Sequence, residues 1–170
     1  MAPPFRLGLI GAGRMGRTHL RALAGSQRVA VTAIAEVSEQ TRRTVPAAGT
    51  PVYPGIAEML DAEALDGVLI VVPTDRHLQV ITEVAARGLP ILCEKPCGLT
   101  VAQTRAAVTA TVAAGVRERA QLAALRLQAE GFAGFASGGP CTGATGADAI
   151  AALDAATRAG AAIPALSASP

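Results

Sequence analysis

The stretch Phe5-Arg-Leu-Gly-Leu-Ile-Gly-Ala-Gly-Arg-Met-Gly16 decides how the first part of this chain folds. Its first six residues form a short apolar run that ends before a glycine, which is typical of a buried β-strand. Three glycines follow at the spacing Gly11-x-Gly13-x-x-Gly16, and apolar residues then recur at helical spacing as far as Ala24. The order of strand, glycine turn and helix favours a dinucleotide-binding unit over a chance cluster of glycines.

Each of the three glycines has a separate physical purpose in such a unit. Gly11 permits the tight turn, Gly13 lets a pyrophosphate approach the backbone, and Gly16 lets the helix pack closely on the strand. The free N–H groups at the start of the helix then favour phosphate oxygens. A tight glycine turn that binds nothing is the alternative interpretation.

Glu36 ends the second β-rich run, residues 29–35, and lies twenty residues beyond Gly16. An acidic side chain at this place can accept hydrogen bonds from both hydroxyls of the adenosine ribose and would repel a 2′-phosphate. The sequence therefore predicts NAD as cofactor in preference to NADP. An ordinary surface carboxylate is the alternative for Glu36. Arg42 and Arg43 lie close enough to complicate the preference, although a solvated helix face is the favoured interpretation of both.

Strand-like and helix-like segments alternate about five times as far as Ala114. Strands are expected at residues 5–10, 29–35, 52–53, 67–72 and 90–94, and helices at residues 14–24, 38–45, 56–60, 76–87 and 100–114. This alternation predicts an α/β fold with a doubly wound parallel sheet. Such sheets bind ligands at the carboxyl ends of their strands, where the glycine turn, Glu36, the segment Pro73–Asp75 and the pair Glu94–Lys95 all fall.

Three polar residues stand where helices are expected to begin. Ser38, Asp75 and Thr100 each precede a helical pattern, and short polar side chains at such positions accept hydrogen bonds from the first free N–H groups. We therefore expect all three to act as N-caps.

Composition excludes several classes of function. The net charge is +2 and only 2% of residues are aromatic, so neither nucleic acid nor a membrane surface is expected as a partner. No apolar run has the length of a membrane span, and no charged leader precedes one, which predicts a cytoplasmic protein. The three cysteines, Cys93, Cys97 and Cys141, do not have the spacing of a zinc site, so we expect free thiols and no metal.

Three motifs together resemble those of the glucose–fructose oxidoreductase and inositol dehydrogenase family, known as Gfo/Idh/MocA. They are Gly11-x-Gly-x-x-Gly-x-x-His19, Pro73-Thr-Asp-Arg-His77 and Cys93-Glu-Lys-Pro96, and the resemblance covers roughly residues 5–115. Members of this family are NAD(P)-dependent oxidoreductases of sugars and polyols. Each has an N-terminal Rossmann domain, which binds the cofactor, and a C-terminal α/β domain.

The resemblance also implies roles for individual residues. The glycine loop would hold the pyrophosphate and Glu36 the adenosine ribose, whereas Thr74, His77, Glu94 and Lys95 would lie along the nicotinamide. The loop positions are Gly11, Gly13, Arg14, Met15 and Gly16. Lys95 would be the catalytic residue that reaches the substrate hydroxyl, because an ammonium group stabilises an oxygen that gains negative charge. An exposed loop lysine is the alternative for Lys95, and local packing or capping is the alternative for His19.

The resemblance ends near residue 115, and two domains of unequal character are predicted. Residues 1–115 would form the Rossmann domain, and residues 116–170 an atypical, poorly ordered tail. Residues 131–170 contain 14 alanines and 7 glycines, as a GC-rich stretch read out of frame would. The hypothesis is a frameshift between about Val116 and Gln121, with the second domain absent. Apolar surface left uncovered would favour self-association.

The family also uses an Asp and a His from its second domain for substrate binding and proton transfer. Both histidines of this chain precede Lys95, and no Asp-x-x-x-His follows it. The resemblance therefore implies a cofactor-binding half of an enzyme for a small sugar or polyol such as myo-inositol, with little or no activity of its own. A non-catalytic regulatory or vestigial dinucleotide-binding module is the second hypothesis, and a methyltransferase-like domain is the third. The Glu94-Lys95-Pro96 motif favours the first.

Overall fold

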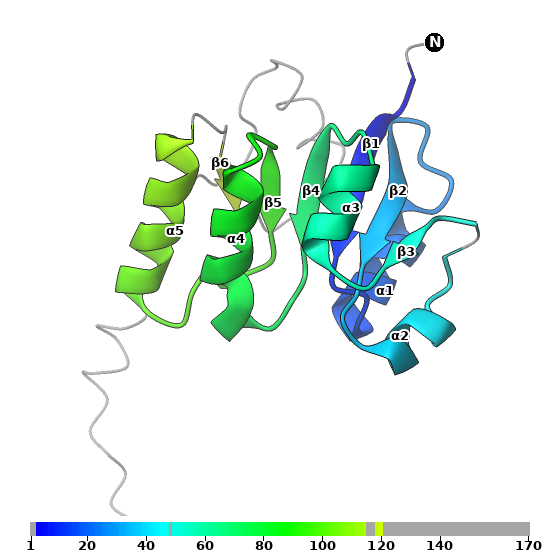
Figure 1. The fold of residues 1–170 in the computed structure, drawn as a ribbon, viewed down its shortest axis with the longest axis horizontal. Helices are drawn as coiled ribbons and strands as arrows, with labels where there is room; N and C mark the ends of the chain where they lie inside the picture. The colour runs from blue at the N-terminus through cyan, green and yellow to red at the C-terminus, as the bar shows by residue number, and fades with distance from the viewer. Residues whose placement is uncertain (1–2, 48, 115–117, 121–170) are drawn as a thin grey trace, which may run out of the picture.

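The computed structural model describes residues 3–47, 49–114 and 118–120, which form one parallel sheet flanked by helices (Figure 1). The strand order is β3-β2-β1-β4-β5-β6, and every neighbouring pair runs parallel. The strands are β1 (Phe5–Ile10), β2 (Val29–Ala35), β3 (Val52–Tyr53), β4 (Gly67–Ile70), β5 (Ile91–Cys93) and β6 (Glu118–Ala120). The predicted doubly wound α/β fold is confirmed.

Helices connect the strands as right-handed crossovers require. They are α1 (Arg14–Leu23), α2 (Glu39–Thr44), α3 (Ile56–Ala62), α4 (His77–Ala85) and α5 (Val101–Ala113), with a 3₁₀ turn η1 (Thr74–Arg76) before α4. Figure 1 shows α3, α4 and α5 in front of the sheet and α1 behind it. The strand order reverses between β1 and β4, and a crevice opens at that point beyond the carboxyl ends of the strands.

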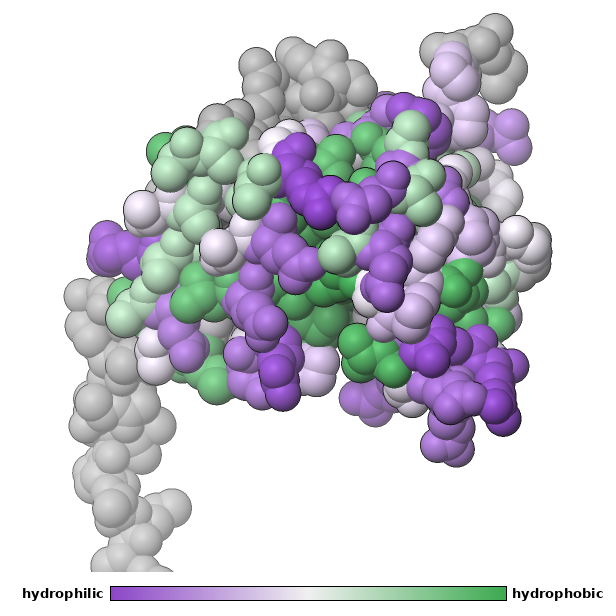
Figure 2. Space-filling view, viewed as in Figure 1, coloured by the Kyte–Doolittle hydropathy of each residue, from purple (hydrophilic) through white to green (hydrophobic). Residues whose placement is uncertain are grey.

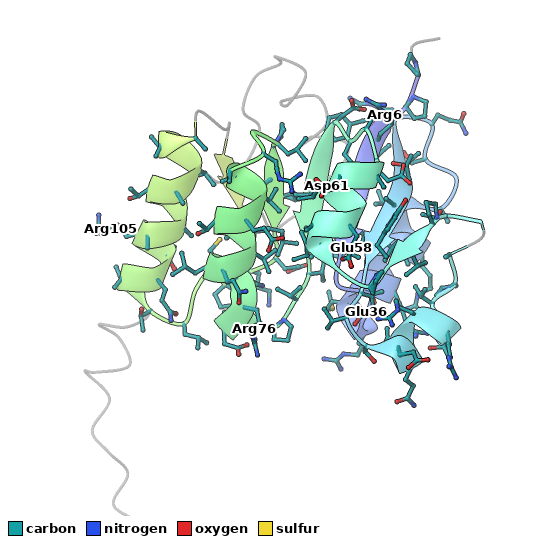
Figure 3. All side chains as sticks on the ribbon, viewed as in Figure 1. Arg6, Glu36, Glu58, Asp61, Arg76 and Arg105 are labelled. Atoms are coloured by element: carbon teal, nitrogen blue, oxygen red, sulfur yellow. The ribbon has the colours of Figure 1, made fainter. Side chains whose placement is uncertain are left out.

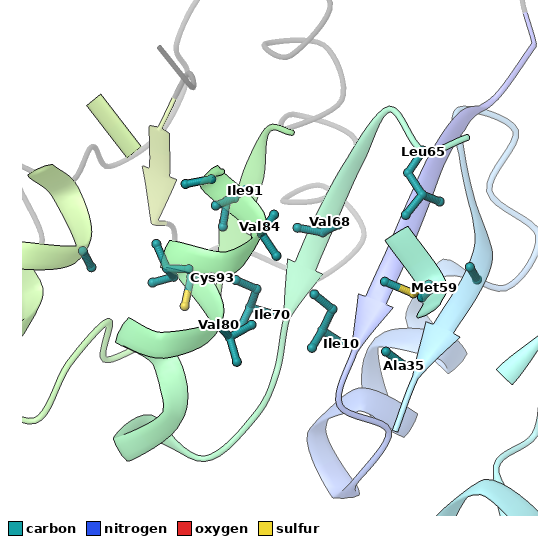
Figure 4. Packing of buried hydrophobic residues seen from close by; sticks show 14 residues of the cluster. Ile10, Ala35, Met59, Leu65, Val68, Ile70, Val80, Val84, Ile91 and Cys93 are labelled. Carbon is teal, nitrogen blue, oxygen red and sulfur yellow. The ribbon is translucent and has the colours of Figure 1, made fainter. Parts of the chain in front are cut away.

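The core lies on both faces of the sheet because β1 and β4 are apolar along nearly their whole length. All four residues of β4 are buried, as expected for a central parallel strand covered on both sides. On the face of α3 and α4, Ile70 packs with Met59 and Val84 (Figure 4). On the opposite face, Leu9 packs with Leu23 of α1. This packing holds the carboxyl ends of the strands in register.

Two of the three predicted N-caps are confirmed. The Ser38 hydroxyl accepts the Thr41 N–H at 3.2 Å, and the Thr100 hydroxyl accepts the Gln103 N–H at 3.1 Å. The third prediction was wrong, because Asp75 lies inside the 3₁₀ turn η1 and caps nothing. Its carboxylate lies 3.7 Å from the Arg76 guanidinium instead. The strand expected at residues 67–72 is also shorter and ends at Ile70.

A sixth strand, which the sequence did not predict, lies near the start of the segment expected to form a separate tail from residue 116 onward. Residues 118–120 pair in parallel with β5, with Ile91 opposite Glu118 and Cys93 opposite Ala120. These three residues carry no β-branched or aromatic side chain, so their sequence gives no strand signal. The remainder of the predicted tail, with Cys141, lies outside the described residues.

The molecular surface in Figure 2 is polar over much of α4 and more apolar along the outward side of α5. Val112 of α5 is 65% exposed. Among the helices that the structure describes, none combines the length and the apolar character that crossing a bilayer requires.

Replacing Ile70 with Ala is expected to lower the free energy of unfolding by about 2–5 kcal/mol, because the side chain is fully buried and its removal leaves a cavity. Urea denaturation followed by circular dichroism measures the change. Val112→Ala is the control, since this side chain is mostly exposed, and it should change the free energy by no more than about 0.5 kcal/mol. Equal effects of the two substitutions would contradict the packing described above.

The ion pair between Arg6 and Asp66 gives a pH-dependent prediction. Hydrogen bonds from the Arg6 side chain, at 2.8 Å for Nη2, lower the pKa of Asp66 in the folded protein. A carboxyl whose pKa is lowered by folding stabilises the protein above its unfolded pKa, about 3.9, and this contribution is lost as the pH falls through the folded pKa. The stability advantage of the wild type over Asp66→Asn should therefore be full at pH 6 and shrink below about pH 4. Thermal unfolding at several pH values tests this, and an advantage that grows on acidification would refute it.

Candidate functional site

A pocket of about 550 Å³ lies beyond the carboxyl ends of β1, β2 and β4. Its walls come from the glycine loop with Gly11 and Gly13, from Glu36 after β2, and from the segment between Val72 and Arg76. Figure 3 shows Glu36 and Arg76 at the same end of the sheet, opposite the end that carries Arg6. Both the volume and the mainly apolar wall are typical of small-molecule sites.

The three glycines of the loop differ in what the protein itself demands of them. Gly11 has φ +96°, and a Cβ there would lie 2.7 Å from the carbonyl oxygen of Val71. A Cβ on Gly16 would overlap the carbonyl oxygen of Gly11, so this glycine is what allows α1 to approach β1. A Cβ on Gly13 would meet nothing within 4 Å. The fold explains Gly11 and Gly16, whereas the open space over Gly13 fits a ligand that approaches the backbone.

The start of α1 is open to an anion. Gly13 is the N-cap residue and offers no side chain to the first N–H groups, and the first turn contains no acidic residue. A helix start without a side-chain cap leaves N–H groups that a phosphate can satisfy. The loop and the helix start therefore fit a pyrophosphate.

The Glu36 carboxylate holds the glycine loop against the end of β2. One oxygen accepts the Ala12 N–H at 2.8 Å, and the other accepts the Ser38 N–H at 2.8 Å. A carboxylate oxygen has two lone-pair sites, so each oxygen can still accept a ribose hydroxyl. The position of Glu36 in the pocket wall agrees with the predicted role.

The two arginines near Glu36 behave differently. Arg42 folds back and donates to the carbonyl oxygens of Glu36, at 2.8 Å, and Val37, at 2.7 Å, so it is not part of a solvated helix face. Arg43 is exposed and pairs with Glu39 one turn earlier, as that interpretation predicts. Arg42 thus stabilises the backbone that carries Glu36.

His77 lies beneath the pocket rather than in it. The side chain is 1% exposed, and its Nδ1 and Nε2 atoms each lie 2.9 Å from a carbonyl oxygen, of Pro96 and Val72 respectively. Neither ring nitrogen is left for a cofactor. His77 instead joins the Val72 segment to the turn after Lys95, and Thr74 lies in η1 above it.

Glu94 and Lys95 follow directly after β5, where the sheet ends. The Glu94 carboxylate lies 2.7 Å from Nε2 of His19 and accepts the Lys95 N–H at 3.0 Å. The hydrogen bond to His19 is the largest cause that lowers the pKa of Glu94, so this carboxyl is ionised at neutral pH. The His19 ring is buried on α1, and its hydrogen bond reaches Glu94, a residue 75 positions away in the sequence.

Lys95 is exposed, and its peptide bond to Pro96 is cis. It is also the single lysine in the sequence, since the other 14 basic residues are arginines. Sequence reasoning missed this count, although it needs no structure. Of the predicted residues, Gly11, Gly13 and Glu36 line the pocket, whereas those of the nicotinamide half lie outside its wall.

The two cysteines that the structure describes, Cys93 and Cys97, form no disulfide. The hydrogen bond with Cys97, together with burial, raises the pKa of the Cys93 thiol well above its ordinary value, so Cys93 is not a nucleophile at neutral pH. Within the described residues, no group of three or more His, Cys, Asp or Glu side chains could hold a metal ion.

These features define a dinucleotide-binding Rossmann domain, and comparison with known proteins identifies its family. The model of the Gfo/Idh/MocA family, described as an oxidoreductase family with an NAD-binding Rossmann fold, matches residues 5–121. The chain therefore belongs to this family, as its motifs predicted.

Curated relatives match about 60% of the chain. The rhizopine catabolism protein MocA of Rhizobium meliloti is 47% identical over 103 residues, which are 61% of this chain and 32% of the relative. An inositol 2-dehydrogenase of Rhizobium meliloti (strain 1021) is 34% identical over 101 residues, or 59% of this chain and 31% of the relative. The chain thus spans about a third of the length of these relatives.

Solved structures agree with the fold. The WlbA dehydrogenase of Bordetella pertussis, in complex with NADH and UDP-GlcNAcA, superimposes with a TM-score of 0.66 at 26% identity, over 71% of this chain and 35% of that protein. A putative myo-inositol dehydrogenase of Sinorhizobium meliloti 1021 gives a TM-score of 0.62 at 30% identity, over 70% and 36% of the two chains.

The glycine geometry predicts that the stability of the fold depends on Gly16 and not on Gly13. Gly16→Ala should lower the melting temperature by several degrees, because its Cβ overlaps the carbonyl oxygen of Gly11. Gly13→Ala should leave the melting temperature within about one degree, because the new methyl group meets no atom and the residue has negative φ, −64°. Differential scanning calorimetry of the two variants without cofactor measures this. A Gly13→Ala variant as unstable as Gly16→Ala would contradict the loop geometry.

Proposed function

We propose that this chain supplies the cofactor-binding half of an NAD-dependent oxidoreductase that transfers hydride between the nicotinamide and a hydroxyl of a sugar or polyol. The observation that carries the proposal is the open space over Gly13, at the start of an uncapped helix and inside the pocket wall. The pyrophosphate would lie against the backbone from Gly11 to Gly16, including Arg14 and Met15. Bound NAD would supply the hydride acceptor.

The preference for NAD over NADP rests on the Glu36 carboxylate. Two backbone N–H groups fix both of its oxygens in the pocket wall, so it cannot turn away from a ribose substituent at low cost. A fixed negative charge accepts two ribose hydroxyls and repels a 2′-phosphate. Arg42 does not offset this repulsion, because its guanidinium is engaged with backbone carbonyls.

Lys95 would act at the nicotinamide end, beside Thr74 and Glu94. When hydride leaves a carbon, the attached hydroxyl must lose its proton, and a group that accepts or shares this proton lowers the barrier. An amine can take up and release a proton, whereas a guanidinium stays protonated in proteins. The use of lysine here, in a chain whose other basic residues are arginines, supports a proton-handling role.

Several of the relatives are inositol 2-dehydrogenases, which supports a sugar or polyol as the proposed substrate. The same proposal includes a division into residues 1–115 for the cofactor and residues 116–170 as a separate segment, a cytoplasmic location, and self-association through uncovered apolar surface. Size-exclusion chromatography tests the last of these.

A non-catalytic dinucleotide-binding module is the second candidate function, and one observation favours it. His19 and His77, the two histidines of the chain, are each 1% exposed and bonded to protein groups. Neither can therefore replace the acid–base histidine that the family takes from its second domain. Absence of NAD reduction with myo-inositol, together with tight NADH binding, would favour this candidate.

Cofactor binding itself gives the test of the main proposal. The chain contains no Trp, so the fluorescence of NADH can be titrated without interference. We expect NADH to bind at least about tenfold more tightly than NADPH. Gly13→Ala should lower the affinity for each of the two cofactors by about tenfold or more. Glu36→Ala should narrow the ratio between the two cofactors. Both cofactors bind the same glycine loop, so a general loosening of that loop would lower both affinities and leave their ratio unchanged. Equal affinities in the wild type would overturn the assignment of NAD.

A further inference from the structure

The Glu94 carboxylate stands between two partners that compete for it. Lys95 follows it directly in the chain, and the ammonium lies near enough to contribute to lowering the pKa of Glu94. Nevertheless, among the residues that the structure describes, no ion pair involves Lys95. The carboxylate instead faces α1, where His19 holds one of its oxygens at 2.7 Å.

His19 is well placed to fix this carboxylate. Its ring is 1% exposed, whereas the Glu94 side chain is 16% exposed, so the hydrogen bond is shielded from water. The second oxygen of Glu94 accepts the Lys95 N–H at 3.0 Å, and the Glu94 N–H donates to Ile70 at 2.9 Å. Backbone and side chain of Glu94 are therefore both held, whereas the Lys95 side chain is exposed.

The protonation state of the ring follows from its second nitrogen. Nδ1 of His19 is buried and has no hydrogen-bond partner among the described residues. A proton on a buried nitrogen without an acceptor costs about 1–3 kcal/mol. The geometry therefore favours a neutral ring that carries its hydrogen on Nε2 and donates it to Glu94. The pair retains the full negative charge of the carboxylate.

We propose that His19 is a positioning residue that holds the Glu94 carboxylate against α1 and so prevents it from forming an ion pair with Lys95. The ammonium then remains available for a substrate hydroxyl. This inference rests on the proposed function in assigning Lys95 to the substrate, but the arrangement of the three side chains can be tested without substrate or cofactor.

Among the residues that the structure describes, three titratable groups face the Glu94 carboxylate. They are His19 from α1, Lys95 from the same turn and the Cys93 thiol from β5. The thiol is neutral over most of the working range because its pKa is raised. A change in the position of the Glu94 carboxylate should therefore appear mainly as a change in the pKa of Lys95.

Because Lys95 is the only lysine, its titration can be observed directly. Reductive methylation with ¹³C-formaldehyde labels Lys95 and the N-terminal amine alone. The N-terminal amine titrates near pH 8 and a lysine near pH 10.4, so the two NMR signals separate. Because the geometry favours a neutral His19 ring, replacing His19 removes no charge, and a change at Lys95 reports movement of the carboxylate.

The decisive comparison is between the wild type and His19→Leu, which removes the donor. We expect the pKa of Lys95 to rise by about 0.5 unit or more, because the released carboxylate can approach the ammonium. His19→Gln keeps an N–H donor at a similar reach and should restore the wild-type value. Arg21→Gln, an exposed substitution on the same helix, should leave the value unchanged. His19→Met removes the donor with a more adaptable side chain, and serves if His19→Leu does not fold.

A second substitution assigns the shift to the carboxylate. In the background of Glu94→Gln, His19→Leu should no longer move the pKa of Lys95, because no charge is left to be released. A pKa of Lys95 that is the same within about 0.2 unit in the wild type and in a folded His19→Leu variant would overturn the proposal. Titration with NADH tests the proposed function separately. A wild type that binds no NADH but shows the His19-dependent shift would refute that function and leave the positioning role in place.

Discussion

The close approach of Gly16 to the carbonyl oxygen of Gly11 is the contact on which the rest of the site depends. Any larger residue at position 16 would push α1 away from β1. With α1 in place, its open N-terminus points at the pocket, and its next turn brings His19 within 2.7 Å of Glu94 at the end of β5. One backbone contact thus positions both the phosphate-binding end of the site and the turn that carries Lys95.

Two glutamates at the carboxyl ends of β2 and β5 use the same physical device. Glu36 accepts N–H groups from Ala12 and Ser38, and Glu94 accepts bonds from His19 and from the Lys95 N–H. A carboxylate held at both oxygens loses little further conformational entropy when a ligand binds, because its side chain is already ordered in the folded protein. Each glutamate also ties a loop to a distant element, which gives the crevice a fixed shape before any cofactor binds.

The sequence predicts those features that depend on local pattern. The bounds of β1 and β2 follow from mainly apolar runs. The starts of α2 and α5 follow from the short polar side chains of Ser38 and Thr100, which cap these helices. The prediction that Asp75 is an N-cap was wrong because a 3₁₀ turn shifts the start of α4 to His77. A single polar residue does not determine the type of turn that precedes a helix. The strand β6 was missed because parallel pairing with β5 uses backbone groups and needs no particular side chain. The bond between His19 and Glu94 joins residues 75 apart, so no local pattern contains it.

The choice between lysine and arginine among the basic residues of the chain points to a chemical role for Lys95. Fourteen of them are arginines, and in this structure arginines serve in ion pairs and on backbone carbonyls, as Arg6 and Arg42 do. A guanidinium suits such fixed roles because it is planar and permanently charged. The single ammonium stands on an exposed turn, beside a carboxylate that is already engaged elsewhere. If Lys95 served only to place a positive charge there, an arginine would do so equally well. What a lysine offers and an arginine does not is a group that can exchange a proton. Lys95 can do so only if the Glu94 carboxylate does not hold its ammonium in a permanent ion pair.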